Sequence, residues 1–311
     1  MKISVIVASH RSDFIANLLD SLAAQSLDPA EFEVIVAADY KIETLQHRYP
    51  HIRWEFLDDH SISAKRNKGV FHSRADILAF IDDDCIADPN WLKNAYDYLS
   101  AHPECAAVEG FTSIETAVAN TGLLKEYKRL EKPGFRTNNI FYRRELFVKV
   151  GGFDERFSVQ REDADLAFSV IENGGKIDFC SDIRVKHRFR YWERWDLLKN
   201  CWNRRFDPLL YKKHPQLYRK YIRTPLTPSI IALSGTYLLL ILASFFSVTR
   251  IKSVILINTF IIPVLAFRRT GWINFSLEYL FFNLISVSLA PLVVVLALLT
   301  GSIRFKKILI I

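Results

Sequence analysis

Three consecutive carboxylates, Asp82, Asp83 and Asp84, directly follow five apolar residues at positions 77–81. A short, unbroken apolar run is typical of a strand that is covered on both faces, as in the parallel sheets of α/β domains. Ligands of open α/β sheets bind beyond the carboxyl ends of the strands, where this acidic cluster lies. Side chains two residues apart on an extended segment point the same way, so we expect Asp82 and Asp84 to converge while Asp83 faces elsewhere.

Two convergent carboxylates suit a divalent cation. Mg²⁺ and Mn²⁺ prefer oxygen ligands and usually bind one or two carboxylates together with the phosphates of a substrate. We therefore predict a Mn²⁺ or Mg²⁺ site at Asp82 and Asp84, and His187, which follows a later strand-like segment, could complete it. The alternatives are a solvated acidic turn and, for His187, an ordinary surface or hydrogen-bonded histidine.

A second acidic group heads a helix-like stretch and consists of Glu162, Asp163 and Asp165. Asp163 precedes Leu166 and Ala167 by three and four residues, so it shares their inward-facing side, whereas Asp165 does not. A carboxylate at a helix N-terminus is held ionised by the helix dipole, which is the state that a general base needs. We predict that Asp163, with Glu162, forms the catalytic group that deprotonates an acceptor hydroxyl. The alternative is simple dipole complementation by first-turn acids.

Alternating strand-like and helix-like segments must position these carboxylates. The expected strands are residues 2–8, 32–38, 52–57 and 77–82, with helices opening near residues 12 and 61. This alternation builds a parallel sheet through right-handed crossovers. Polar loops follow three of the strands, at residues 9–11, at Asp39 and at residues 82–84, so a nucleotide could lie across them at one edge. We predict an α/β fold with a mainly parallel central sheet flanked by helices.

The sequence has neither GxGxxG after the first strand nor GxxxxGK[ST], so neither a dinucleotide fold nor a P-loop is indicated. The charge of a diphosphate must then be neutralised in another way. A metal at Asp82 and Asp84, helped by Lys65 or Arg66, would do so. A solvated first helical turn is the alternative for Lys65 and Arg66, and a turn or capping role is the alternative for Asp39.

The composition changes sharply beyond Arg223, where Leu, Ile, Val, Phe and Ala come to dominate. We predict a catalytic domain at residues 1–223 and an all-α membrane region at residues 224–311. The candidate spans are residues 225–248, 253–267 and 280–299. Because a hydrocarbon core needs ~20 residues, at least two transmembrane helices are expected and the short middle stretch leaves a third open. One segment could instead lie flat as an interfacial helix.

Basic and aromatic residues cluster at positions 186–223, and the chain has a formal charge of +7. Nucleic acid is one possible partner, but no nucleic-acid motif accompanies the cluster. Cytoplasmic Lys and Arg beside a membrane, with aromatic rings at the interface, account for it more simply. The four scattered cysteines indicate free thiols in a reducing compartment, and the opening KISVIVAS does not match a secretory signal. We expect a multi-pass protein, such as one of the bacterial inner membrane, with its catalytic domain in the cytoplasm and no nucleic-acid partner.

The order of these motifs resembles the family 2 glycosyltransferases, which have the nucleotide-sugar-binding GT-A fold. The shared motifs lie between residue 3 and about residue 187 and are VIVASHR, Asp39, SAKRNKGV, FIDDDCIADPNWL, NNIFYRRELF with GGFDERF, and REDADLAF. The nucleotide-sugar-binding residues that the resemblance implies are Ser9, His10, Arg11, Asp39, Lys65, Arg66, Asn67, Asp82 and Asp83. It also makes Asp82 and Asp84 the DxD pair, with Asp84 the more probable metal ligand, and matches Asp163 to the catalytic base of inverting members.

The reaction that the resemblance implies is a direct displacement, in which the base activates an acceptor hydroxyl and the metal stabilises the departing diphosphate. Two positions depart from the family. Members often have two acids followed by Gly-Ser after the second strand, whereas this chain has Asp39 followed by Tyr40. Processive synthases usually carry QxxRW, and the matching residues 191–195 begin with Tyr in place of Gln. Addition of a single sugar is therefore expected rather than polymer synthesis.

The implied function is a membrane-anchored, metal-dependent transferase that moves a sugar from a nucleotide sugar, expected to be a UDP-sugar, to an acceptor. The acceptor would be a lipid-linked or cell-envelope glycan that the protein meets at the membrane lipid. Two alternatives stay open. One is a processive polysaccharide synthase, and the other is a catalytically inactive membrane scaffold of the same fold.

Overall fold

The computed structural model describes residues 1–10, 12–41, 43–115, 121–190, 193–245, 248–270 and 276–309. The chain divides into two compact units. Unit 1 comprises Met1–Thr116 and Tyr127–Phe189, and unit 2 comprises Ala117–Glu126 and Arg190–Ile311. Most of the basic and aromatic cluster at 186–223 thus groups with the apolar helices, and the predicted boundary at residue 223 stays a prediction. Arg11, predicted to bind nucleotide, lies outside the described residues, as do the first two residues of the 191–195 motif.

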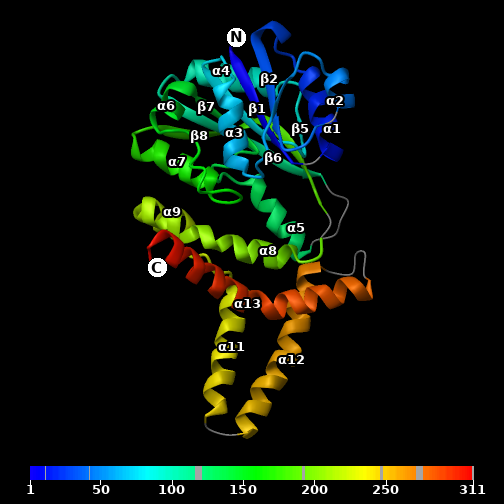
Figure 1. Ribbon diagram of the computed structural model, residues 1–311, viewed down its shortest axis with the longest axis vertical. Coiled ribbons are helices and arrows are strands. Elements are labelled where there is room, and N and C mark those ends of the chain that lie inside the picture. The colour runs from blue at the N-terminus through cyan, green and yellow to red at the C-terminus, as the bar shows by residue number, and fades with distance from the viewer. Residues whose placement is uncertain are drawn as a thin grey trace. The chain divides into compact units, whose positions relative to one another are not determined.

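Eight strands form one sheet in unit 1, in the order β3-β2-β1-β4-β7-β6-β8-β5 (Figure 1). The strands are β1 (Ile3–Ser9), β2 (Phe32–Ala38), β3 (Arg53–Phe56), β4 (Ile77–Asp82), β5 (Cys85–Ala87), β6 (Cys105–Glu115), β7 (Asn139–Arg143) and β8 (Lys176–Arg188). The first four strands along the chain pair in parallel, as the strand–helix alternation predicts. β7 then pairs antiparallel with β4 and with β6, while β8 runs parallel to β6. The predicted α/β fold is confirmed.

Helices cover both faces of this sheet. Those of unit 1 are α1 (Ser12–Ala23), η1 (Pro29–Glu31), α2 (Glu43–Arg48), α3 (Ile62–Phe71), α4 (Trp91–Ala101), η2 (Lys128–Glu131), α6 (Arg144–Lys149) and α7 (Glu162–Glu172). One apolar cluster joins α1 and α4 to alternate residues of the strands, and a second joins α3, α6 and α7 to the others. In β4, Ala79 lies in the first cluster and Phe80 in the second, because successive side chains of a strand point to opposite faces. Both faces of β4 are therefore buried, and its polar residues begin only where the strand ends.

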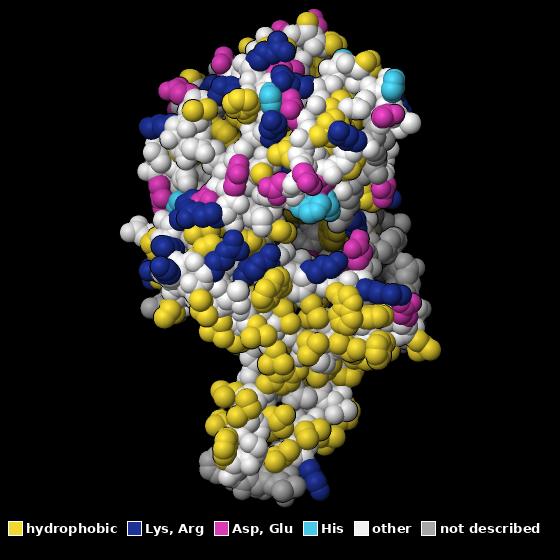
Figure 2. Space-filling view, viewed as in Figure 1, with side chains coloured by type: hydrophobic (Ala, Val, Ile, Leu, Met, Phe, Trp, Pro, Cys, Tyr) yellow, Lys and Arg dark blue, Asp and Glu magenta, His cyan; other side chains and the backbone are white. Residues whose placement is uncertain are grey.

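Unit 2 is helical. Its elements are α8 (Asp196–Trp202), η3 (Asn203–Phe206), α9 (Asp207–Lys213), α10 (Pro215–Leu217), η4 (Tyr218–Ile222), α11 (Pro228–Ser244), α12 (Val248–Thr270) and α13 (Leu277–Phe305), with α5 (Gly122–Tyr127) lying mostly in this unit. Two helical stretches, Ile251–Arg269 and Leu277–Phe305, are long and apolar enough to cross a membrane, and α11 is apolar but shorter. Hydrophobic side chains are the most frequent coloured side chains on the visible surface of α11, α12 and α13 (Figure 2). By length and composition alone, these two stretches are candidates for membrane association.

Candidate active site

The loops after β1 and β4 are joined at the carboxyl edge of the parallel strands. The register pairs Ala8 with Asp82, so the two strands end side by side. Asp83 Oδ2 accepts hydrogen bonds from Ser9 Oγ at 2.8 Å and from the backbone N–H of His10 at 3.1 Å. The predicted gathering of polar loops is therefore present. The described contacts of Asp83 fasten one loop to the other, which positions Ser9 and His10 beside the acidic cluster.

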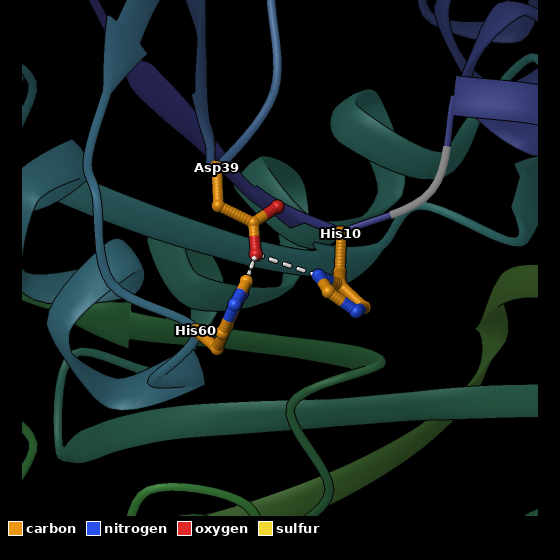
Figure 3. Close-up of side chains that lie close together, drawn as sticks. All are labelled: His10, Asp39 and His60. Carbon is orange, nitrogen blue, oxygen red and sulfur yellow. Dashed lines mark hydrogen bonds and ion pairs between the residues drawn. The ribbon is translucent and has the colours of Figure 1, made fainter.

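Asp39, which follows β2, is the centre of a polar cluster at the same edge (Figure 3). Its Oδ2 atom contacts His10 Nδ1 at 2.6 Å, His60 Nδ1 at 2.5 Å and Lys65 Nζ at 2.9 Å. Burial alone would raise the pKa of Asp39, but the hydrogen bonds from His60, Lys65 and His10 outweigh it and hold that pKa well below its ordinary range. The Lys65 ammonium already supplies positive charge here, so we assign this cluster to hydrogen bonding rather than to a metal.

Helix α3 presents two buried cations to the site. Ser61 caps its first turn by accepting a hydrogen bond from the Ala64 N–H. The side chains of Lys65 and Arg66 are only 2% and 3% exposed. A solvated first turn therefore does not describe α3, because charged groups this deeply buried need ionic partners. Asp39 is the partner of Lys65.

Arg66 connects the acidic loop to α7. Its Nη2 lies 3.0 Å from Asp82 Oδ1, and its Nη1 lies 2.9 Å from Glu162 Oε1. The guanidinium also lies over the ring of Phe153, 5.5 Å from its centroid. A planar guanidinium can bridge two carboxylates in this way, whereas a lysine ammonium would act as a single point of charge. Arg66 thus fixes the two predicted acidic groups, around Asp82 and around Glu162, relative to each other.

The end of β8 brings His187 to Asp84. Strands β5 and β8 pair antiparallel with Cys85 opposite His187. His187 Nε2 lies 3.4 Å from Asp84 Oδ1, and the two side chains are 11% and 4% exposed. Burial is the main cause that raises the pKa of Asp84 to about 6; His187 opposes the rise, while the charges of Asp82 and Asp83 add to it.

These residues fit a divalent cation. Ligand atoms of Asp84, Cys85 and His187 lie within 4.8 Å of one another. Burial raises the pKa of the Cys85 thiol well above its ordinary value, so the thiol stays protonated at neutral pH and is a poor ligand. The remaining carboxylate and imidazole groups suit Mn²⁺ or Mg²⁺ better than a metal that prefers thiolates. A cation would also offset the negative charge of three neighbouring carboxylates.

The carboxylates at the start of α7 lie close together. Glu162 is 6% exposed, and burial together with the charge of Asp163 raises its pKa to about 7, although Arg66 opposes the rise. Burial also raises the pKa of Asp163, against the Ala164 N–H that donates to its Oδ1 atom at 2.6 Å. The two carboxyl groups titrate as a coupled pair, in which both protonated forms are favoured relative to ordinary carboxyls.

One prediction about α7 is wrong. Asp165 was expected to face away from the interior, but it is 1% exposed and more deeply buried than Glu162. The reason is that Glu162, Asp165 and Leu166 are spaced i, i+3 and i+4, so they share one face of the helix. Leu166, at 0% exposure, packs against the sheet on that face. Asp163 is half-buried.

Asn67 contacts the glycine-rich segment after α6. Its Nδ2 donates to the Phe153 carbonyl at 2.8 Å and to Glu155 at 3.0 Å, and its Oδ1 accepts from the Phe153 N–H at 3.0 Å. Gly152, with φ of +70°, makes the turn that brings Phe153 into reach. Asn67 thereby anchors the loop that carries the Phe153 ring to Arg66. Its predicted contact with a nucleotide stays a prediction.

Two residues of the site were missed in the sequence. His60 contacts Asp39 from the loop before α3, and no motif marks it. Glu109 of β6 is 4% exposed and accepts hydrogen bonds from the backbone N–H groups of Gly134, Phe135 and Arg136 at 2.8–3.1 Å. Glu109 therefore holds the backbone of the loop before β7 in place. Phe135 of that loop has a left-handed backbone conformation, with φ of +63°. An acid inside an apolar strand-like run was the available signal for it.

Comparison with known proteins identifies the family of the chain. A sequence model of the family described as Glycosyl transferase family 2 matches residues 4–164. The chain is 26% identical over 269 residues to a glucosyl-dolichyl phosphate glucuronosyltransferase of Haloferax volcanii, covering 76% of this chain and 82% of the relative. It is 28% identical over 218 residues to an O-antigen chain rhamnosyltransferase of Salmonella typhimurium, covering 62% of this chain and 68% of the relative.

A solved structure shares the fold. It is a mannosyltransferase from Pyrobaculum calidifontis in complex with GDP-Man and Mn²⁺, with a TM-score of 0.58, 16% identity, and coverage of 94% of this chain and 87% of the other. At this identity the likeness concerns the fold alone, which is that of a GT-A glycosyltransferase. The match of the family model spans more than half of the 311 residues. The chain therefore belongs to glycosyl transferase family 2.

Proposed function

We propose that this glycosyltransferase works at a membrane, depends on a divalent metal, and moves one sugar from a nucleotide sugar to a lipid-linked or cell-envelope glycan, with inversion at the anomeric carbon. The observation that carries the proposal is the bridge made by Arg66, whose guanidinium contacts Asp82 on the acidic loop and Glu162 beside Asp163. Groups suited to the donor diphosphate and groups suited to the acceptor hydroxyl thereby belong to one connected site.

On the acceptor side, Asp163 is the proposed general base. An acceptor hydroxyl would lose its proton to the Asp163 carboxylate as its oxygen attacks the anomeric carbon, and the bond from that carbon to the diphosphate would break. The raised pKa of Asp163 makes the carboxylate a stronger base than an ordinary aspartate. Glu162 and Arg66 would position it, because Arg66 fixes the start of α7 against the acidic loop.

On the donor side, Asp84 and His187, with Asp82, would hold Mn²⁺ or Mg²⁺. The metal would supply positive charge to the departing diphosphate. Asp39 would accept a hydrogen bond from the nucleobase, in place of a hydrogen bond from His10 or His60 that it accepts now. Ser9 and Lys65, which border Asp39 and Asp83, would complete the nucleotide pocket.

The acceptor class is proposed as the sequence indicates, whereas the donor class is proposed more broadly. The relatives are named for glucuronosyl transfer to a dolichyl-phosphate-linked glucose and for rhamnosyl transfer in O-antigen chains, and the solved neighbour was bound to GDP-Man. A lipid-linked or cell-envelope acceptor is compatible with these names and with the apolar helices of unit 2. Uridine, the base expected from the sequence, is therefore one of several nucleotide bases to test.

The test is donor-dependent release of nucleoside diphosphate by detergent-purified protein. UDP-, GDP- and dTDP-sugars would be offered with a polyprenyl-phosphate-linked glycan, and the product analysed by mass and by NMR of the new anomeric centre. We expect turnover of one donor, one added sugar and an inverted linkage. A polymeric product would instead support a processive synthase, and a retained configuration would overturn the inverting mechanism. If the protein showed no turnover and no metal-dependent nucleotide binding, the result would support the alternative of a catalytically inactive scaffold.

A further inference from the structure

Helix α13 has an exposed face that is apolar over most of its length, with the exposed Glu278 near its start. Its exposed large apolar residues are Leu277, Phe281, Leu289, Leu292, Val295, Leu296, Leu299 and Ile303. Most of these are three, four or seven to eight residues apart, so they form one stripe on the helix. The buried residues form the opposite stripe and include Asn283, Ser286, Val287, Ala290, Val294, Ala297, Gly301 and Phe305. The helix is therefore packed on one side and open on the other.

The packed side lies along a polar and cationic segment of the same unit. Near its start, Glu278 forms an ion pair with Arg194. Near its end, Gly301 packs so closely on the Arg205 backbone that there is no room for a Cβ atom beside the Arg205 carbonyl oxygen. The Lys212 ammonium donates to the Phe305 carbonyl at 2.9 Å. Contacts thus run from one end of α13 to the other, and α8, η3 and α9 accompany it in the same chain direction over this length.

The accompanying segment is too polar for a hydrocarbon core. Beside the middle of α13, where Cys201 packs on Ala290 and Val294 in one apolar cluster, α8 also carries Lys199. The Lys199 side chain is 64% exposed, so it would face lipid if α13 crossed the membrane. Charged groups exposed to lipid at that depth are costly and rare. If α13 crossed the membrane, α8, which packs beside its middle, would have to enter the hydrocarbon core as well.

Helices α11 and α12 have a different relation to α13. They pack against each other as a pair, and only one end of that pair meets α13 (Figure 1). Leu233, near the start of α11, and Ala266, near the end of α12, share a cluster with Val287. The far parts of the pair, such as Leu242 and Ile255, are exposed and apolar. Because α13 lies across the end of the pair, α13 and the pair cannot both run along the membrane normal.

We propose that α13 lies in the plane of the membrane interface, with its apolar stripe in the lipid and the cations of α8 to η4 toward anionic headgroups, while the α11–α12 pair alone enters the hydrocarbon. Lys and Arg side chains form a band at the level of α8 and α9, next to the apolar surface of α13 (Figure 2). Layering of cations over an apolar face is the pattern of proteins that lie on anionic lipid. The proposal rests on membrane association, not on the reaction.

Depth measurements on single cysteines test this orientation. Cys180, the one half-buried cysteine, would be changed to Ser, because Cys85, Cys105 and Cys201 are buried. Nitroxide labels would then be placed on full-length protein in vesicles that contain phosphatidylglycerol. The labelled variants are Phe281→Cys, Leu292→Cys and Ile303→Cys on α13, Leu239→Cys on α11, and Lys199→Cys on α8 as the water-exposed control.

Collision with oxygen and with a water-soluble nickel chelate reports the depth of each label. We expect equal, shallow depths at the three α13 positions, and a greater depth at Leu239→Cys. Phe281 and Ile303 are roughly 33 Å apart along a helix, so a transmembrane α13 would place Leu292→Cys near the bilayer centre and the other two labels in the opposite headgroup regions. That V-shaped profile would overturn the proposal, as would α13 labels as wet as Lys199→Cys. If Leu239→Cys were also wet, membrane association itself would fail.

Discussion

The guanidinium of Arg66 lies 2.9 Å from the carboxylate of Glu162, and both side chains are almost completely buried. This pair joins α3, which carries the cations of the donor side, to α7, which carries the proposed base. A buried ion pair is strongly destabilised when one partner is removed, because the other is left charged without compensation. The Arg66–Glu162 contact therefore has consequences for stability as well as for activity.

Removal of Arg66 should destabilise the fold. We expect Arg66→Met to lower the free energy of unfolding by about 3 kcal/mol, because Glu162 and Asp82 both lose a partner. The double variant with Glu162→Gln should cost less than the two single changes added together. Urea unfolding of the four proteins measures this cycle.

Arg156→Met is the matched control, since the Arg156 side chain is 58% exposed and pairs with Asp154 at the surface. An exposed pair contributes at most about 1 kcal/mol. The Arg66 bridge would have no structural role if Arg66→Met lowered the free energy of unfolding no more than Arg156→Met does. The same would follow if the loss in the double variant equalled the sum of the two single losses.

The acid limb of the pH profile should depend on Glu162. Burial raises the pKa of Glu162 to about 7 and also raises the pKa of Asp163. The base must be ionised, so kcat/KM should fall as the pH decreases through the apparent pKa of the pair. The charge of ionised Asp163 raises the pKa of Glu162, so the pair becomes fully ionised only above that raised pKa. In Glu162→Gln this second ionisation is gone, so Asp163 alone governs the limb, which should move to lower pH. Glu145→Gln, an exposed carboxylate on α6, should leave it unchanged. An unmoved limb in Glu162→Gln would contradict this coupling.

Asp39 should contribute stability to the fold that is lost at acidic pH. Its pKa in the folded protein is held below the ordinary value of about 4, chiefly by hydrogen bonds from His60, Lys65 and His10 that outweigh burial. That contribution is fully present above about pH 4 and is lost as the pH falls through the lowered pKa. Asp39→Asn should therefore be less stable than wild type near neutral pH, and the difference should shrink toward pH 2. Urea titrations at several pH values would show it, and a difference independent of pH would refute it.

Several features of the fold were readable in the sequence because they are local. The apolar runs at 32–38 and 77–82 match β2 and β4, since burial on both faces selects continuous apolar residues. The expected helix near residue 61 is α3, whose N-cap is Ser61. Parallel alternation then brings Asp39 and the acidic loop to one edge, as predicted.

Other features depend on contacts between distant segments. The approach of His187 to Asp84 comes from the β5–β8 ladder, which no local pattern specifies. Lys65 and Arg66 have the sequence appearance of a solvated turn. Their burial is explained by their ionic partners, which are Asp39 after β2, Asp82 at the end of β4 and Glu162 on α7. Asp165 was assigned to the wrong environment because its helical neighbours, and not its own type, decide its burial. Hydropathy likewise could not separate a helix that crosses a bilayer from one packed along α8 to α9.

In the proposed mechanism, one site combines a metal at Asp84 with a base at Asp163. The most direct test measures Mn²⁺-dependent donor binding and turnover in Asp84→Asn and Asp163→Asn, with Asp182→Asn as a control, since that carboxylate is 72% exposed. Asp84→Asn should lose both Mn²⁺-dependent binding and turnover. Asp163→Asn should bind donor and Mn²⁺ as wild type does but turn over at least 100-fold more slowly, in line with the usual contribution of a general base. Turnover at the wild-type rate in Asp84→Asn or in Asp163→Asn, whether EDTA is present or absent, would contradict these two roles.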